Sequence, residues 1–600
     1  MSYLPIGAYG LIGDSRAAAL VAANGSIDWL CLPRFDSPSV FGRLLDHESG
    51  GYFSIGPAAG GVGRQSYIED TNVLQTTFET ETGELIVTDF MPALTEALKR
   101  QRLMPQRQLV RLVEARGQVD VAVRFEPRPN YGRRVPRMHR HTPTAIVAET
   151  GRDWLHLRSD CPLELSDGAA VSHFSLADGE QRSLLLSYAL HETGVLPAQD
   201  DGRWLLDRTV EFWREWTTCC SYEGPFQKEV RRSALALKLL AYAPTGGIIA
   251  APTTSLPERI GGERNWDYRY CWLRDASLTV RALLDVDCVA EAQSFTEWLL
   301  HATRLTHPRL QVMYDVYGET RLREREMTHM EGYRGSRPVR VGNAAAEQHQ
   351  LDIYGEVFDA VATYLSRTGA RPDGETRSML RRMADHVVNI WEQPDEGIWE
   401  VRSVRLHHTY SKAMAAVALD RAVSLRNAGL IDGDGRRWEE AAAAIRRKVM
   451  TQGFNRRLGA FTRTFDGEDV DASLLLLPLL RFLSADAPEM VSTVDRIVAD
   501  LGENDYIYRY RQVDDGLSGG EGAFLACGFW LATVMAQRGD LAESQRLIEQ
   551  QCRAANSLAL LPEEVDPLTN EELGNFPQAL SHIALLNAAV ALSDASNGPR

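Results

Sequence analysis

Acidic side chains gather in one stretch near the end of the sequence, residues 561–583, LPEEVDPLTNEELGNFPQALSHI. The pattern predicts a loop that opens into an apolar helix, with Asn575 as its cap and Pro577 in its first turn. Carboxylates gathered before a helix indicate acid–base chemistry, and we interpret one of them as half of a catalytic pair. The acidic residues of the loop are Glu563, Glu564, Asp566, Glu571 and Glu572.

Glu400 is the first candidate for the other half of the pair. It follows Trp399 in the run DEGIWEVR at 395–402. A carboxyl behind a tryptophan in a pocket mouth has the surroundings that raise a pKa by desolvation, which suits a general acid. The alternative is a solvated loop glutamate. In the C-terminal loop we favour Glu563 over Glu564, because consecutive side chains rarely face one point.

Aromatic and charged residues crowd together in a second run, NWDYRYCWLRD at 265–275. Aromatic faces stack on the C–H surfaces of sugars, and an adjacent arginine and aspartate can fork onto neighbouring hydroxyls. Trp272, Arg274 and Asp275 are therefore candidate substrate-binding residues. The alternative is that Arg274 and Asp275 form only an ion pair in the first turn of a helix.

Further candidates lie in other predicted loops. Gln350 and Asp352 stand where a helix is expected to begin, and Asp352 is alternatively only its N-cap. Glu356 lies one turn further along and is the rival of Glu400. Arg511, which precedes a glycine-rich turn, can reach a ligand hydroxyl or form a structural pair with an aspartate.

A helical domain must position these residues. From Phe226 nearly to the end, apolar residues recur with a period of 3.6. The connections after odd-numbered helices are long and polar and the others are shorter, so the long loops gather at one end. Six such hairpins predict an (α/α)6 toroid with a polar pocket at its axis. The expected helices are 226–243, 274–286, 289–305, 352–366, 376–391, 410–425, 437–449, 472–482, 488–501, 522–538, 541–555 and 577–592.

Residues 1–205 have a different pattern, with short runs rich in β-forming residues that Gly, Pro, Asn and Asp punctuate. About a dozen such runs predict a large antiparallel β-sandwich. We find no catalytic constellation there and expect this domain to be mainly structural. Residues 206–225 are predicted to form a linker helix, and residues 226–600 the catalytic domain.

Composition limits the other possibilities. A chain of 600 residues is too long for one core. A net charge of −16 disfavours nucleic acid and anionic membranes as partners. No signal peptide and no apolar run of about 20 residues is evident, so we expect a cytoplasmic protein. The eight cysteines form no CxxC pair, and we expect no metal and no cofactor. Whether the protein is a homo-oligomer stays open.

At these residues the chain resembles glycoside hydrolase family 15, the glucoamylase and trehalase family. The resemblance covers almost the whole chain, and the N-terminal run PIGAYGLIGDSRAAALVAANGSIDWLCLPRFDSPSVF is similar to the opening of bacterial members, especially trehalases. Members join an N-terminal β-sandwich by a linker to an (α/α)6 catalytic domain. The most specific internal matches are YRYCWLRDA, GIWEVR…YSKAMAAVALDRA, DDGLSGGEGAFL and LLPEEVDP…LGNFPQALSH.

The resemblance implies roles for single residues. The family's general acid falls on Glu400, beside Trp399, and its general base on Glu563. One departure is Val401, where fungal members carry a second glutamate, and this keeps Glu356 open as the acid. The residues that would bind the terminal glucose are Trp272, Arg274, Asp275 and Arg511.

The expected activity is therefore hydrolysis of a terminal α-glucosidic bond with inversion, which releases glucose from a small α-glucoside. A trehalase is favoured over a glucoamylase-type enzyme. One alternative is a phosphorolytic enzyme of similar toroid shape, although the acidic cluster at 563–572 would repel phosphate. A second is a non-catalytic glucan-binding regulator, although both carboxylates are present. A third is a terpene-cyclase-like toroid, although that would need DDxxD-type metal sites with an apolar pocket and the loops here are too polar.

Overall fold

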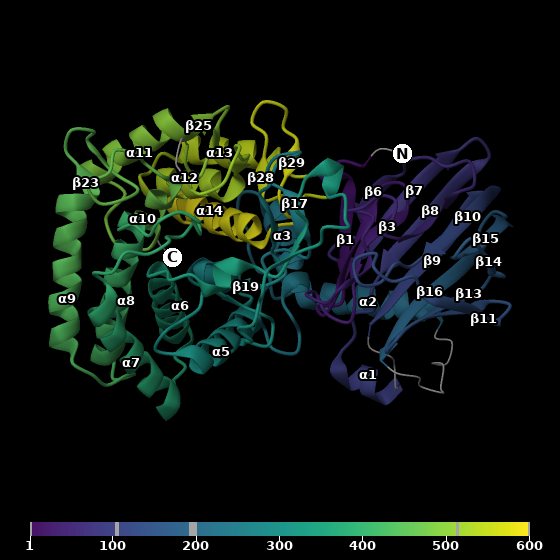
Figure 1. Ribbon diagram of the computed structural model, residues 1–600, viewed down its shortest axis with the longest axis horizontal. Helices are drawn as coiled ribbons and strands as arrows, with labels where there is room; N and C mark the ends of the chain where they lie inside the picture. Colours follow the sequence, from purple (N-terminus) through teal and green to yellow (C-terminus); the bar gives the residue numbers. More distant parts are fainter. Residues whose placement is uncertain (1–2, 103–106, 191–200, 512–514, 598–600) are drawn as a thin grey trace.

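The protein consists of a β-sandwich and a helical toroid, which lie at opposite ends of the molecule (Figure 1). This confirms the predicted fold class. The predicted division at residues 205 and 225 stays a prediction; the last strand of the sandwich ends at Leu190, helix α2 spans Gly202–Thr217, and α3 begins at Gln227. The computed structural model describes residues 3–102, 107–190, 201–511 and 515–597.

The first sheet of the sandwich is antiparallel and has the strand order β1-β2-β3-β5-β10-β15-β14, with β4 paired to β3. Burial alternates along β10, where valines and a phenylalanine face the core and the residues between them are more exposed. The strands are β1 (Tyr9–Gly13), β2 (Ala18–Ala22), β3 (Ser26–Cys31), β4 (Ser39–Phe41), β5 (Tyr52–Pro57), β10 (Val119–Glu126), β14 (Glu164–Ser166) and β15 (Ala169–Leu176).

The second sheet is also antiparallel and has the order β11-β12-β13-β16-β9-β8-β7-β6. A short helix, α1 (Glu96–Arg102), lies between β8 and β9 in the chain, and α2 packs against β9 and β16. The strands are β6 (Arg64–Tyr67), β7 (Leu74–Thr80), β8 (Gly83–Phe90), β9 (Gln108–Gly117), β11 (Arg137–Thr142), β12 (Ala145–Thr150), β13 (Asp153–Ser159) and β16 (Gln181–Leu190).

A buried arginine joins the two sheets. Arg111 on β9 pairs with Asp89 on β8 at 2.6 Å, and both side chains are fully buried. Arg111 also donates to the backbone oxygens of Phe53 at 2.6 Å and Gly25 at 2.7 Å, which belong to the facing sheet and its turn. These partners compensate the charge that the sandwich buries.

The toroid contains twelve α-helices among the described residues, as the periodicity predicts. The even-numbered helices form an inner ring, in which α4 packs on α6, α6 on α8, α12 on α14, and α14 on α4. The helices are α3 (Gln227–Leu240), α4 (Ala276–Asp285), α5 (Val289–Thr306), α6 (Asp352–Thr368), α7 (Gly374–Ile390), α8 (Thr409–Asn427), α9 (Gly435–Lys448), α10 (Leu476–Leu479), α11 (Pro488–Leu501), α12 (Leu525–Gln537), α13 (Leu541–Cys552) and α14 (Ala579–Asn597).

Burial distinguishes the two rings of helices. The outer helix α7 buries one stripe and is capped by Asp373, whose side chain accepts from the Thr376 N–H at 2.7 Å. The inner helix α14 is buried nearly all round. By length and composition α14 is apolar enough to cross a membrane, but 78% of that stretch is buried inside the protein. Its place in the inner ring explains its composition.

Two helix predictions are corrected. The helix expected at 472–482 is a 3-10 turn followed by the single turn of α10. Pro478 supplies no N–H to continue this helix, and the chain reverses at Arg481, where φ is 59°.

Asn575 does not cap α14, which begins at Ala579. Its side chain instead joins two loops, because it accepts from the Thr253 hydroxyl at 2.9 Å and donates to a backbone oxygen at 3.0 Å.

The sandwich also holds the first long loop of the toroid, residues 241–275. Arg269 in this loop is fully buried and pairs with Asp267 at 2.7 Å. Its guanidinium also donates to the Ser37 backbone oxygen at 2.9 Å and to the Tyr131 hydroxyl at 3.0 Å, both in the sandwich. The N-terminal domain therefore fixes a loop that carries predicted site residues.

Candidate active site

A polar pocket lies among the long loops at one end of the toroid, as predicted. Its free volume is about 30 Å³, far below the roughly 300–1,000 Å³ of ligand pockets, so a ligand of that size can enter only when side chains at the rim move. Four loops supply the lining, which consists of Glu258, Arg264, Trp266, Tyr268, Arg274, Asn343, Ala345, Trp399, Glu400, Val401, Arg402, Arg509, Tyr510, Asp515 and Leu517.

A larger cavity of about 1180 Å³ lies among the C-terminal ends of the inner helices. Its buried carboxylate, Asp359, is clamped by Arg281 at 3.0 Å and Arg421 at 2.7 Å. None of the site residues predicted from the sequence lines this cavity. We therefore place the candidate active site at the smaller, loop-lined pocket.

Glu400 lines the pocket, and its backbone has a left-handed φ of 59°. A non-glycine residue in this region costs on the order of 1–3 kcal/mol, so its surroundings must fix it. Its Oε1 accepts from the Trp272 indole N–H at 2.5 Å and from Arg274 Nη1 at 3.2 Å. Burial raises the pKa of Glu400, and the Arg274 cation opposes the rise only in part. A raised pKa favours the protonated form that a general acid needs.

Arg274 and Asp275 lie in a 3-10 turn directly before α4. Arg274 Nε donates to Asp275 Oδ1 at 2.9 Å, and both side chains are more than nine-tenths buried. Although burial lowers the pKa of an arginine, Asp275 and Glu400 outweigh it and raise the pKa of Arg274. The pair is therefore part of the pocket wall rather than a solvated ion pair.

Glu563 precedes strand β28 (Glu564–Val565) and is fully buried. Its Oε2 accepts from the Asn575 backbone N–H at 2.8 Å, whereas no protein atom hydrogen-bonds to Oε1. Burial, and then the neighbouring Glu258, raise the pKa of Glu563 to about 8, and the Arg509 cation opposes this rise. This second oxygen, Oε1, is buried too, and its candidate partners are a water molecule and the nearby Tyr268 hydroxyl, whose hydrogen bonding lowers the pKa of Glu563 in part.

Tyr268 lies near both Glu400 and Glu563. Its ring packs edge-on against Trp272, with the ring centroids 5.0 Å apart, and Trp272 in turn donates to Glu400. Burial and then the charges of Glu563, Glu258 and Glu400 raise the pKa of Tyr268. The structure thus brings Glu400 into the pocket and Glu563 next to Tyr268 and Glu258, which line it.

Arg509 lies within a cluster of buried acids. Its Nη2 is 2.8 Å from Glu258, 2.6 Å from Glu521 and 3.1 Å from Glu564. Carboxylate oxygens of Glu258, Glu563 and Glu564 lie within 4.8 Å of one another, as a metal site would require, but the Arg509 guanidinium already supplies the cation there. Because Glu564 also accepts from the Gly522 N–H at 2.8 Å, it is engaged with structural partners, which favours Glu563 as the reactive acid.

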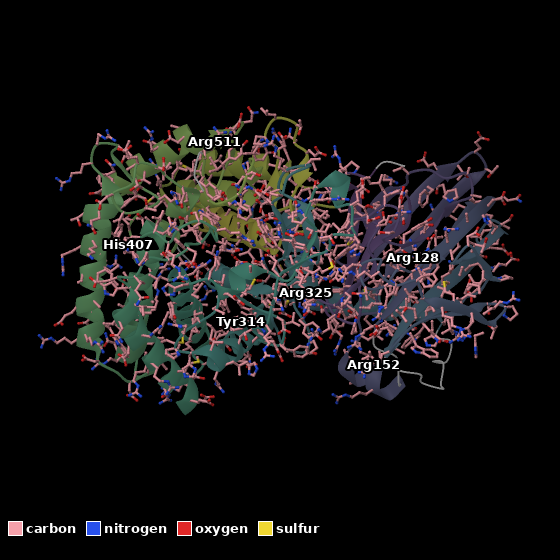
Figure 2. All side chains as sticks on the ribbon, viewed as in Figure 1. Arg128, Arg152, Tyr314, Arg325, His407 and Arg511 are labelled. Atoms are coloured by element: carbon pink, nitrogen blue, oxygen red, sulfur yellow. The ribbon has the colours of Figure 1, made fainter. Side chains whose placement is uncertain are left out.

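Arg511, which the sequence suggests could reach a ligand, does not line the pocket. Arg511 lies at the outer margin of the helical domain (Figure 2), where it pairs with Glu503 at 2.5 Å and its guanidinium lies over the Tyr508 ring. Arg509, two residues earlier, lines the pocket instead. The segment carries both arginines within three residues, and only the fold determines which of them faces inward.

Gln350 and Asp352 are buried behind the pocket and do not line it. The Gln350 side chain donates to Gln348 at 3.2 Å, and Gln348 donates to the Glu400 backbone oxygen at 3.1 Å. Asp352 is not an N-cap, because neither of its carboxylate oxygens has a hydrogen-bond partner. Burial, and then Asp395, raise the pKa of Asp352 to about 8. Gln350 therefore acts on Glu400 only through Gln348, and neither Gln350 nor Asp352 lines the space that a ligand would occupy.

Trp399 and Glu356 differ in their relation to the pocket. Trp399 lines it, donates to Asp471 at 3.2 Å and stacks on Trp530 with a centroid distance of 6.0 Å. Glu356 lies outside the lining and accepts from the Tyr410 hydroxyl at 2.8 Å. The structure therefore favours Glu400 over Glu356 as the acid of the pocket.

Sequence reasoning missed three residues of the site, Glu258, Tyr268 and Arg509. Tyr268 lies within the aromatic run at 265–275 and was within reach of the same argument as Trp272. Glu258 stands in a short run without aromatic or acidic neighbours, LPERIGG, so no local signal indicates it. Only the pairing of loops far apart in the chain brings Glu258 to Arg509 and Glu564.

Comparison with known proteins identifies the relatives of each part of the chain. A sequence profile of the glycosyl hydrolases family 15 matches residues 224–590, and a profile of a trehalase-like N-terminal domain matches residues 2–161. The chain is 36% identical to a trehalase of Mycolicibacterium smegmatis, covering 98% of this chain and 91% of that protein. It is 34% identical to a trehalase of Thermoplasma volcanium, covering 99% and 94%.

A solved structure shares the whole architecture. The crystal structure of a bacterial glucoamylase complexed with acarbose matches with a TM-score of 0.72, covering 99% of this chain and 96% of that one. Because the two sequences are only 12% identical, this match shows that the two proteins share a fold and nothing more.

We predict that Glu563→Gln stabilises the protein in a pH-dependent way. The pKa of Glu563 is about 8 in the folded protein against 4.5 ordinarily, so the unfolded chain loses this proton first as the pH rises. The folded wild type therefore loses stability between these two values, whereas the glutamine variant does not. Denaturant unfolding should show a gain of up to about 4 kcal/mol for the variant at about pH 8.5 and little at about pH 5.

Exposed Glu439 on α9 provides the matched control for this measurement. Glu439→Gln should leave the free energy of unfolding within about 0.5 kcal/mol of wild type at both pH values. An equal effect of Glu563→Gln at the two pH values would contradict the desolvated state assigned to Glu563.

Proposed function

The chain belongs to the glycosyl hydrolases family 15, and on that premise we propose that it hydrolyses α,α-trehalose to two molecules of glucose. It is a glycosidase that acts on α-glucosides. Similarity to trehalases over nearly the full length of both chains supports trehalose as the substrate. One observation carries the mechanism: a buried glutamate with a raised pKa lies in the pocket, and a second lies beside its wall.

The proposed reaction uses the two acids on opposite sides of the bond. Protonated Glu400 donates to the glycosidic oxygen, and ionised Glu563 takes a proton from a water that attacks the anomeric carbon from the other face. This direct displacement inverts the configuration and needs carboxyl groups about 6.5–9.5 Å apart. Burial raises the pKa of both acids, which helps Glu400 hold its proton. It also raises the pKa of Glu563 to about 8 against the opposing Arg509 cation, so the ionised base is the minor form below that pH and its share increases as the pH rises towards 8.

The pocket wall offers the contacts that a glucose ring requires. Trp266, Tyr268 and Trp399 present aromatic surfaces for the C–H faces of the ring. The Arg274 guanidinium, held by Asp275, presents donors to neighbouring hydroxyls. Arg402 stacks on Trp266 with its Cζ 4.1 Å from the ring centroid, and it pairs with Glu324 at the partly exposed side of the pocket. We infer that Arg402 is among the side chains that move when the sugar enters.

We predict faster release of glucose from α,α-trehalose than from maltose or isomaltose, in assays of the purified chain without added phosphate. Inversion converts the attacked glucose to the β anomer and leaves the other as α, so NMR of the first products should show equal amounts. Products that are initially all α would contradict inversion. Formation of a glucose phosphate when phosphate is supplied would contradict a hydrolytic reaction. A preference for maltose would contradict the proposal that α,α-trehalose is the substrate.

We further predict that Glu400→Gln and Glu563→Gln each lower kcat for trehalose by about 10²–10⁴-fold, because each removes one proton transfer. Arg511→Ala should retain wild-type kcat/KM, because this arginine lies outside the pocket, and Arg509→Ala should not. The melting temperature of each variant reports whether it folds. Full activity of Glu563→Gln, with loss of activity in Glu564→Gln, would reverse the assignment of the base.

A further inference from the structure

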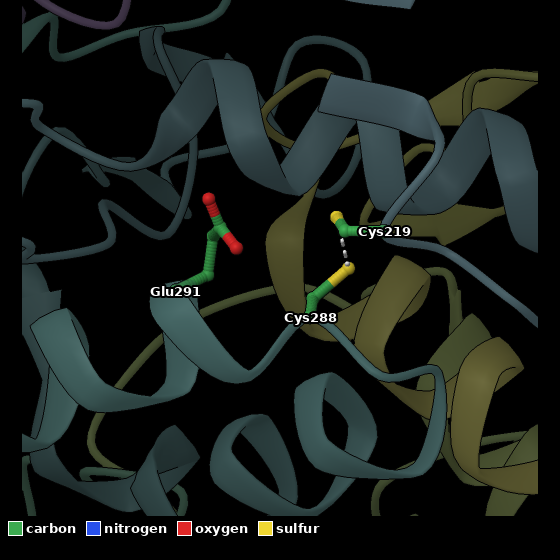
Figure 3. A group of neighbouring side chains, drawn as sticks. All are labelled: Cys219, Cys288 and Glu291. Atoms are coloured by element: carbon green, nitrogen blue, oxygen red, sulfur yellow. Dashed lines mark hydrogen bonds between the residues drawn. The ribbon is translucent and has the colours of Figure 1, made fainter. Parts of the chain in front are cut away.

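Three cysteines meet where the linker joins the toroid. Cys219 and Cys220 follow helix α2, and Cys288 directly precedes helix α5. The sulfur atoms of Cys219 and Cys288 lie 3.5 Å apart, and Figure 3 shows their side chains facing each other. Cys288 is fully buried, whereas Cys219 is partly exposed. This arrangement provides one thiol that solvent can reach and one inner thiol in contact with it.

Beside these cysteines, hydrogen bonds already attach the linker to the turn before α5 and to α5 itself. The Trp216 indole donates to Glu291 at 2.7 Å, and Lys238 of α3 pairs with the same carboxylate at 2.9 Å. The Ser221 hydroxyl donates to Asp287 in the turn before α5. Glu291 is thereby neutralised by Lys238, which makes it a poor third ligand for a cation beside the sulfurs. The cluster therefore suits thiol chemistry better than metal binding.

The surroundings also favour reactive thiolates on the linker side. Hydrogen bonding with Cys288 lowers the pKa of Cys219, and it lowers the pKa of Cys220 to about 7 against the opposing effect of burial. The same contacts raise the pKa of Cys288. A thiolate is the form of cysteine that attacks a peroxide or a disulfide. The linker cysteines are thus the nucleophiles, and Cys288 is the thiol that completes the reaction.

We propose that Cys219 and Cys288 form a redox-controlled disulfide that tethers the linker to the toroid. The oxidant is hydrogen peroxide. The Cys219 thiolate attacks one peroxide oxygen, the O–O bond breaks, and a sulfenic acid and one water form after proton uptake. Cys288 then attacks the Cys219 sulfur, loses its proton and displaces the second water. Two thiols are oxidised, one peroxide is reduced to two waters, and a dithiol reductant reverses the bond.

Counting thiols in the full-length protein tests the tether. The reduced chain is treated with hydrogen peroxide, unfolded and alkylated, and its mass and peptides are analysed. We expect two fewer alkylated cysteines than in the reduced chain, and a cross-link between the peptides that hold Cys219 and Cys288. The melting temperature should rise by about 5 °C, because the bond closes a long loop in the unfolded chain, and dithiothreitol should reverse the rise.

Single substitutions assign the pair. Cys219→Ser and Cys288→Ser should lose the cross-link, and Cys220→Ser should keep it. Cys552→Ser is the matched control, since Cys552 is also partly exposed but lies on α13, and it should behave as wild type. An unchanged thiol count, a bond made by Cys220 in the wild type, no rise in melting temperature on cross-linking, or zinc retained by the reduced protein would each overturn the proposal.

Discussion

Arg509 is the cation on which the pocket depends, because it offsets in part the burial of the acids around it: it lowers the pKa values of Glu258, Glu563 and Glu564, which burial raises. It lies within 3.1 Å of Glu258, Glu521 and Glu564. A buried carboxylate without such a partner costs several kcal/mol of lost hydration. One guanidinium cannot neutralise all of these carboxylates, so burial leaves the pKa of Glu563 raised, and one of its oxygens has no hydrogen-bond partner. The same dry surroundings that raise its pKa make that oxygen a strong acceptor for a water molecule.

The two acids share desolvation but differ in their neighbours. Glu400 is held by Trp272 and Arg274 from the loop before α4, and Glu563 by a backbone N–H and by the acids around Arg509. Each loop is long and polar, and its position is fixed by contacts outside the helices. Arg269 ties the first loop to the sandwich by way of Ser37 and Tyr131. A domain without catalytic residues of its own thus contributes to the geometry of the site.

The sequence predicts the helices well because burial of an apolar face produces a regular pattern. Eleven of the twelve expected helices are present among the described residues, whereas the one expected at 472–482 is a 3-10 turn followed by the single turn of α10, which contains Pro478. Glu400 and Glu563 could be named from the sequence, because tryptophan and proline neighbours mark their loops, and their catalytic roles stay a prediction. What sequence could not resolve is which member of a close pair faces inward. Arg509 and Arg511 have the same chemistry, and Glu258 becomes part of the site only through contacts made across the chain.

The most direct test of the account is a crystal structure with an unhydrolysed trehalose analogue bound in the pocket. The account predicts a Glu400 oxygen within hydrogen-bonding distance of the glycosidic oxygen. It also predicts one water on the opposite face of the sugar, held by the free oxygen of Glu563. A sugar that sits elsewhere, or carboxyl groups only about 5–5.5 Å apart with no room for that water, would contradict it.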